Sequence, residues 1–185
     1  TLDVSLLITR RGKMVVPDGG HAGDDSLGGG KFDEDLAGYV LAGVEKQHPL
    51  SEFRQNRARL SSAWGRLLLA VEEAKIKLSN STQSRVVIDD LCRDDKGRTV
   101  NIDVTVTRKA YEDLIRPDVE RAVQIRRMLL KNNRLEPRAI ETLILVGGPS
   151  KTPFIRDMLR DRLGIPLEFS IDPMTAVVQG AAIYA

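Results

Sequence analysis

The final third of the chain, from Glu141 to Ala185, constrains the fold most. An apolar run at Leu143–Val146 meets Gly147-Gly148, and an amphipathic helical pattern begins a few residues later. A strand that ends in paired glycines before a helix brings bare backbone N–H groups close to whatever lies above it, and the helix N-terminus favours phosphate there. The same turn is also an ordinary connector between a strand and a helix. The glycines alone leave a nucleotide site and a plain turn as alternatives.

The bulk composition excludes several classes of protein. Of the 185 residues, 42% are hydrophobic and 29% are charged, and the net charge is only +2. No block of like charge indicates nucleic acid or a membrane surface. Cys92 alone cannot form an internal disulfide or a cysteine-based zinc cluster, and His21 and His48 are far apart, so we expect no metal site built by this chain alone.

The ends of the chain and its hydropathy bear on where it acts. No window approaches a membrane-spanning length and no signal peptide opens the sequence, so we expect a cytoplasmic protein. The chain begins at Thr1, inside a strand-like run without an initiator methionine. We therefore expect a fragment of a longer protein.

Hydrophobic periodicity predicts alternating groups of strands and helices, hence an α/β or α+β fold. The expected strands are 1–9, 14–16, 85–91, 99–106 and 142–146, with a short segment at 167–169. The expected helices are 32–47, 53–78, one capped by Thr107 that continues past Pro117, 152–163, and one from Pro173 onward. The stretch 17–30 is predicted to be a loop, and 94–97 a hairpin turn. The apolar face of the helix after Thr107 is predicted to comprise Leu114, Val119, Val123, Met128 and Leu129.

Five segments, in order and in register, carry a family resemblance. They are Thr1–Ser5, Gly23–Asp33, Glu72–Ser79, Val146–Pro153 and Ile171–Ala182. Together they resemble the nucleotide-binding domain of the seventy-kilodalton heat-shock chaperones, the DnaK-type family within the actin-like ATPase superfamily. The resemblance extends over the whole chain, and the sequence looks like a divergent, bacterial-type member.

The resemblance implies a particular lobe of that domain. The fold would be an α/β, ribonuclease-H-like lobe of an actin-like ATPase, with a mixed β-sheet flanked by helices. This would be the second lobe, with residues 1–31 and 107–185 as its core subdomain. Residues 32–106 would be an inserted subdomain of helices and a β-hairpin. The first ATPase lobe and a peptide-binding domain would lie elsewhere in the parent protein.

The resemblance also implies an adenosine site on one helix. Glu72, Lys75 and Ser79 would line it, with Glu72 and Lys75 bonded to the ribose hydroxyls, and their spacing places them on one helix face. Ile76 would present an apolar surface to the adenine. Burial of Ile76 in the core and a plain surface ion pair between Glu72 and Lys75 are the structural alternatives.

The glycine turn would complete this nucleotide site. Gly147 and Gly148 would let the backbone approach the phosphates and ribose. The next positions depart from the family pattern, because Pro149 replaces a hydrogen-bonding residue and Lys151 replaces an arginine that would flank the adenine. Met174 likewise replaces an aspartate. These substitutions make the nucleotide affinity and the purine selectivity uncertain, but they do not affect the predicted fold.

Phosphate-side chemistry is implied for the first residues. Thr1 would contact phosphate or the catalytic water, and Asp3 would help to hold water bound to Mg²⁺. An aspartate in an apolar strand is costly unless it is hydrogen-bonded or solvated, which favours a functional role.

The expected function follows from the resemblance. The parent would bind ATP or ADP with Mg²⁺ and couple hydrolysis to the binding of client polypeptides, with a co-chaperone and a nucleotide exchange factor as further partners. The fragment alone would be inactive, because catalysis needs both lobes. Two alternatives remain: another actin-like ATPase, such as a sugar kinase or a filament-forming protein, and a degenerate, non-hydrolysing interaction module.

Overall fold

The computed structural model describes residues 1–184, and these fall into two units. Unit 1 combines Thr1–Gly29 with the chain from Arg116 onward, and unit 2 is Gly30–Ile115. Helices α1 (Gly29–Glu45) and α4 (Arg108–Asn132) each begin in one unit and end in the other. Each unit is described by itself.

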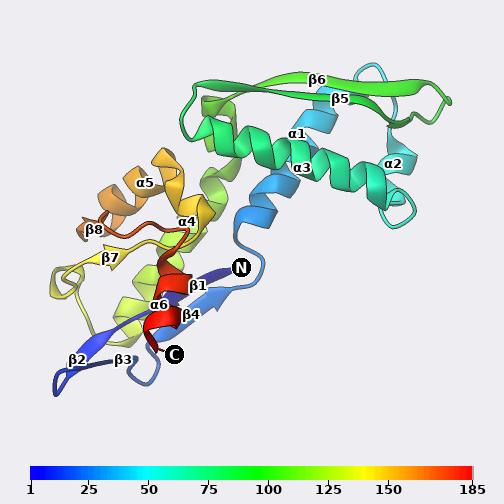
Figure 1. Cartoon of the computed structure of the whole chain (residues 1–185). Helices are drawn as coiled ribbons and strands as arrows, with labels where there is room; N and C mark the ends of the chain where they lie inside the picture. Colours follow the sequence, from blue (N-terminus) through cyan, green and yellow to red (C-terminus); the bar gives the residue numbers. More distant parts are fainter. Residues whose placement is uncertain (185) are drawn as a thin grey trace. The chain divides into compact units, whose positions relative to one another are not determined.

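The architecture is mixed α/β, as predicted, but the described strands pair two by two instead of forming one mixed sheet (Figure 1). β1–β4, β2–β3 and β5–β6 are antiparallel, and β7–β8 is parallel. The strands are β1 Leu2–Ser5, β2 Ile8–Arg10, β3 Lys13–Val15, β4 His21–Asp24, β5 Gln83–Arg93, β6 Thr99–Thr107, β7 Leu143–Ile144 and β8 Leu167–Glu168.

The remaining helices lie mostly where the periodicity predicts them. They are α2 Ser51–Gln55, α3 Ser61–Leu78, α5 Pro153–Leu163 and α6 Ala176–Tyr184, with short 3₁₀ turns η1 Pro137–Ala139 and η2 Gly148–Lys151.

The first strand predicted in unit 1 is divided in two. β1 ends at Ser5 because Leu6 turns into the core, where it is 8% exposed and its N–H donates to the carbonyl of Gly20. The strand predicted at 14–16 is confirmed as β3, which pairs with β2. Arg11 and Gly12, with φ of 50° and 78°, form a two-residue connection between β2 and β3 of the kind that matches strand twist.

The prediction of a continuous loop at 17–30 is wrong, because β4 lies inside it and pairs with β1. Gly23 faces Asp3 in this pair, and a Cβ at Gly23 would lie 2.9 Å from the carbonyl oxygen of Leu2. The glycine is therefore needed for close strand approach, which a loop assignment based on glycine content overlooks.

The predicted helix 53–78 in unit 2 is interrupted between α2 and α3. Asn56 leaves helical geometry with φ −109° and ψ 43°, while its N–H still donates to the carbonyl of Glu52. The chain then turns so that the Arg57 guanidinium lies 4.0 Å from the centre of the Trp64 ring. The cation–π contact with Trp64 stabilises the chain where α2 and α3 are separated. The spacing of the apolar residues does not predict this break.

The predicted hairpin of unit 2 is confirmed, and α3 lies along it (Figure 1). Its turn also organises α2: the Asp95 carboxylate accepts the backbone N–H groups of Ser51 and Glu52 at 3.0 Å each. Asp94 is fully buried at its side chain and accepts a bond from His48 Nδ1 at 3.0 Å. One hairpin turn therefore holds the connection between α1 and α2.

Helix α4 begins as predicted and differs from prediction on its apolar face. Thr107 is its cap, since its hydroxyl oxygen accepts the N–H of Ala110 at 3.1 Å. Met128, predicted to be part of the apolar face, is 61% exposed, and Leu130 is buried instead. Pro117 lies inside the helix, where it cannot donate the usual backbone bond.

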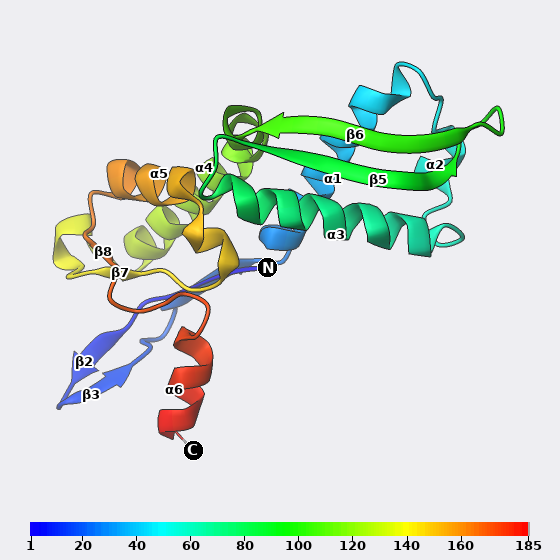
Figure 2. The same cartoon turned by 45° about the horizontal axis from the view of Figure 1, so that its top comes forward.

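The hydrophobic cluster of unit 1 forms where α4, α5 and the β7–β8 pair meet. It consists of Val123, Leu130, Leu145, Leu159, Leu163 and Ile165. Gly164 ends α5 in the left-handed conformation, with φ 66°. Figure 2 shows α6 projecting away from α4 and α5.

Candidate functional site

The paired glycines of unit 1 form the predicted turn after β7. Gly147 has φ 89° and ψ 163°, a conformation that side chains with a Cβ rarely adopt, although nothing lies within 4 Å of where its Cβ would be. Its N–H donates to the carbonyl of Pro173 at 2.9 Å, and the buried Ser150 hydroxyl donates to its carbonyl at 2.6 Å. The glycine is required by the backbone angle, and the turn is firmly hydrogen-bonded.

Two of the three departures from the family pattern, Pro149 and Lys151, lie directly after this turn. Pro149 is in the first turn of η2 and has no backbone N–H to offer a ligand. The Lys151 ammonium lies 3.2 Å from Oδ1 of Asp172, which also accepts the N–H of Met174 at 3.1 Å. The Met174 N–H first, and then Lys151, lower the pKa of the Asp172 carboxyl. Lys151 is therefore tied to the segment that leads into α6.

Thr1 and Asp3 lie together at the start of β1. The Thr1 hydroxyl donates to Oδ2 of Asp3 at 3.3 Å, and the backbone of Thr1 is so close to Gly28 that a Cβ there would lie 2.8 Å from it. The Asp3 side chain is 66% exposed, and His21 Nε2 lies 3.6 Å from its Oδ1. Solvation explains how this aspartate is tolerated in a strand. His21, which sequence reasoning did not assign, lies diagonally across the β1–β4 pair from Asp3, opposite Ser5.

The four residues predicted for the adenosine site share one face of α3 in unit 2. Glu72, Lys75, Ile76 and Ser79 follow the i, i+3, i+4, i+7 spacing, and Ser79 forms the C-cap of the helix. Ile76 is 59% exposed. Its burial in the core, the structural alternative, is therefore excluded.

Lys75 has a partner that the sequence did not reveal. Its ammonium lies 2.7 Å from Oδ1 and donates to Oδ2 of Asp33 at 2.8 Å, and each side chain is only 12% exposed. Burial raises the pKa of the Asp33 carboxyl, with Lys75 acting in the opposite direction and Glu72 in the same one. The available signal was Asp33 in the apolar stripe of α1 with Leu36, Ala37 and Val40, because a buried acid needs a partner.

These predicted residues divide between the two units. The turn at Gly147–Lys151, Thr1 and Asp3 belong to unit 1, and the α3 face with Asp33 belongs to unit 2. The structure thus groups the predicted site residues within each unit.

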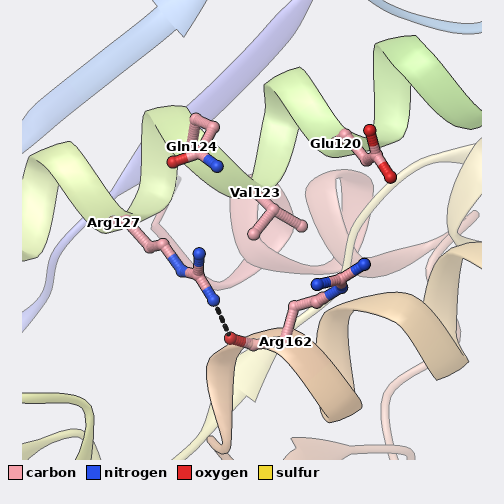
Figure 3. A pocket seen from close by; sticks show the side chains of 5 residues that line it. All are labelled: Glu120, Val123, Gln124, Arg127 and Arg162. Carbon is pink, nitrogen blue, oxygen red and sulfur yellow. Dashed lines mark hydrogen bonds between the residues drawn. The ribbon is translucent and has the colours of Figure 1, made fainter.

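Unit 1 also contains a hollow between α4 and α5 that the sequence did not predict (Figure 3). Its volume is about 290 Å³, and its lining residues are Glu120, Val123, Gln124, Arg127 and Arg162. The Arg127 guanidinium donates to the carbonyl of Arg162 at 2.7 Å, in the last turn of α5. Carbonyls in a final helical turn lack helical partners, so this contact joins the two helices.

Two general findings apply to residues 1–184. No three His, Cys, Asp or Glu side chains in this range are grouped so that they could hold a metal ion. No helix within the same described range is both long and apolar enough to cross a membrane.

Comparison with known proteins gives a match over the whole chain. The sequence matches the family model described as Hsp70 protein over residues 1–185. It is 35% identical to chaperone protein DnaK of Thermoplasma volcanium over 184 residues, which is 99% of this chain and 29% of that protein.

Two further relatives agree. Chaperone protein DnaK of Thermotoga maritima is 32% identical over 185 residues, 100% of this chain and 30% of that protein. The DnaK chaperone of Nitrosopumilus maritimus is 29% identical over 185 residues, again 100% of this chain and 28% of its own length. The chain therefore spans less than a third of the curated relatives it matches.

Proposed function

The chain belongs to the Hsp70 family, and we propose that it forms the second lobe of the ATPase domain of a DnaK-type chaperone. Residues 1–31 and 107–185 would be the core subdomain of this lobe, and 32–106 the inserted subdomain. Membership in the family disfavours a sugar kinase or a filament-forming ATPase.

Each unit would supply residues that contact the nucleotide. The α3 face would contact adenosine, with Ile76 against the adenine and Glu72 and Lys75 at the ribose. Gly147 and Gly148 would admit the phosphates. The exposure of Ile76 most supports this proposal, because an isoleucine that is 59% exposed beside polar residues offers the apolar surface that a purine ring needs.

Mg²⁺ fits the residues of unit 1 through water. Mg²⁺ keeps several bound waters and contacts few carboxylates directly. The Asp3 carboxylate, 66% exposed, is accessible to accept bonds from such waters, and Thr1 is its neighbour. The ion would supply neutralisation of phosphate charge, while Asp3 and Thr1 would orient water and phosphate around it.

The whole protein would couple this chemistry to chaperone action. A first ATPase lobe would supply the remaining phosphate contacts, and a peptide-binding domain would take client polypeptides. A co-chaperone and a nucleotide exchange factor would regulate the cycle. The segment by itself should not hydrolyse ATP, because transition-state charge would not be neutralised from both sides. ATP turnover by the purified segment above a mock preparation would contradict this.

Binding of labelled ADP to the full-length protein tests the nucleotide site. The Ile76→Glu variant should weaken binding about tenfold, the effect of about 1.4 kcal/mol. Leu69→Glu is the matched control, because Leu69 lies two turns earlier in α3 and is 60% exposed. An equal loss in both variants, or no binding by the folded wild-type protein, would refute the proposed site.

A degenerate interaction module is the second candidate function. The observation in its favour is that Lys151 is paired with Asp172 in the chain itself, while Pro149 offers no donor. In that case the full-length protein would still bind polypeptides, and MgADP would neither bind nor change that binding.

A further inference from the structure

Asp33 pairs with Lys75 of the α3 face, and the Asp33 carboxylate has no role in the function proposed so far. Asp33 occupies a position in the buried, otherwise apolar stripe of α1, between Phe32 and Leu36. A lone buried carboxylate there would be strongly destabilising, and a well-packed apolar pair would serve the fold at least as well. A buried ion pair at this position therefore calls for a reason other than stability.

The pair changes the charge that a ligand meets. Lys75 alone would present an ammonium one turn from Glu72, and ammonium groups are general phosphate binders. With both Asp33 oxygens within 2.8 Å of the Lys75 nitrogen, the lysine charge is compensated. The exposed Glu72 carboxylate then makes this part of α3 negative. Such a surface accepts hydroxyl donors and repels phosphate.

We propose that Asp33 determines the specificity of the nucleoside end of the site: it neutralises Lys75, so that the α3 face takes an unmodified ribose diol and excludes nucleotides phosphorylated on the ribose 2′ or 3′ oxygen. This inference rests on the proposed nucleotide site. Asp33 acts through Lys75 and is a positioning residue. The Lys75 side chain is only 12% exposed, and its ion pair with Asp33 holds it in one position.

Competition against labelled ADP on the full-length protein tests this. The competitors are AMP, adenosine 2′,5′-bisphosphate and adenosine 3′,5′-bisphosphate, and the readout is the ratio of their inhibition constants. Wild type should prefer AMP. Asp33→Asn leaves the Lys75 charge uncompensated and should shift the ratio toward the bisphosphates by roughly tenfold. A purely structural loss would weaken all three ligands together.

Asp35→Asn is the matched control. Asp35 lies in the same helix and pairs with Lys31 at 2.6 Å, and the substitution makes the same change of charge. Its ratio should equal that of wild type. An equal shift in this control would overturn the proposal, because general electrostatics would then explain the effect.

The remaining outcomes separate this inference from the proposed function. If wild type binds AMP and ADP but Asp33→Asn keeps the wild-type ratio, only the role of Asp33 is overturned. If folded wild type binds no nucleotide, both fail. If Asp33→Asn does not fold, Lys75→Gln replaces it, since its amide can still donate to Asp33. The preference for AMP must then increase, and an unchanged preference would overturn the proposal.

Discussion

The two units bury their apolar side chains to very different extents. In unit 2, strands of 11 and 9 residues pair with each other, and α3 covers them with residues such as Leu67 and Val71 that are 0% exposed. Unit 1 has strands of two to four residues, and many large apolar side chains remain exposed. These include Leu7, Met14, Val16, Met128, Val146, Phe169, Met174, Val177, Val178 and Ile183.

This difference shows which unit buries its own apolar side chains and which leaves them exposed. Unit 2 is one continuous segment, and its own residues bury its core. Unit 1 instead leaves large apolar side chains such as Phe169 and Val177 exposed, and we expect other protein surface to cover part of them. That agrees with a chain that spans 29% of its DnaK relative from Thermoplasma volcanium.

Truncation of buried and exposed apolar residues should show the largest contrast. Leu67→Ala in unit 2 should cost about 2–5 kcal/mol of unfolding free energy, because it leaves a cavity. Ile183→Ala in unit 1, where the side chain is 87% exposed, should stay within about 0.5 kcal/mol. Urea unfolding of the 185-residue segment measures both. In the full-length protein Ile183→Ala should cost more, and an equally small cost there would break the comparison.

Acid should destabilise unit 2 through its hairpin turn. Burial opposes ionisation of Asp94, but the backbone N–H of Arg98, His48 and the Arg98 guanidinium hold the pKa of Asp94 well below 3.8. Because the folded pKa lies below the unfolded one, the stabilisation is present above pH 3.8 and is lost as the pH falls below it.

Urea midpoints measured between about pH 6 and pH 2 check this. Asp94→Asn should flatten the acid side of the curve. Asp89→Asn, an exposed aspartate in the same hairpin, should leave the curve unchanged. If Asp94→Asn retained the full acid loss, other carboxylates would be responsible.

Backbone strain should distinguish the two glycines of unit 1. Gly147→Ala forces a side chain into φ 89° and should cost about 1 kcal/mol. Gly148→Ala meets only the Met174 sulfur at 3.8 Å, an ordinary contact, and should stay within about 0.5 kcal/mol. Thermal unfolding compares them, and equal losses would mean that Gly147 is not conformationally required.

The smallest effect is expected at the α4–α5 contact. Arg127→Gln removes the bond to the carbonyl of Arg162 and should cost about 0.5 kcal/mol, because water can replace the donor. Arg162→Gln keeps that carbonyl and should have no effect on unfolding free energy. A larger loss in the Arg162 variant would show that its side chain, not its backbone, joins the helices.

Sequence reasoning succeeded where the determining residues are neighbours. The hairpin turn at 94–97, the Thr107 cap and the strand-to-helix turn at Gly147 all follow from local patterns, and the structure confirms them. The Hsp70 resemblance is confirmed by the family match over the whole chain.

The structure differs from the sequence-based predictions mainly where residues distant in sequence make contact. Asp33 finds Lys75 42 positions away, so the carboxylate in an apolar stripe looked unremarkable. The break between α2 and α3 depends on Arg57 turning back over Trp64, and β4 depends on Gly23 approaching β1. Met128 was misassigned because it lies beside the buried stripe of α4, where helical spacing leaves one position of ambiguity.

The bonds that Asp95 accepts from the start of α2 have a consequence for the order of assembly. A helix of five residues cannot persist alone, because nucleation costs more than so few bonds return. Its cap arrives from 44 positions downstream. We therefore expect the β5–β6 ribbon to form first and α2 to appear only afterwards. Opening of that ribbon should in turn release Ser51–Gln55 to proteases before the rest of the unit unfolds.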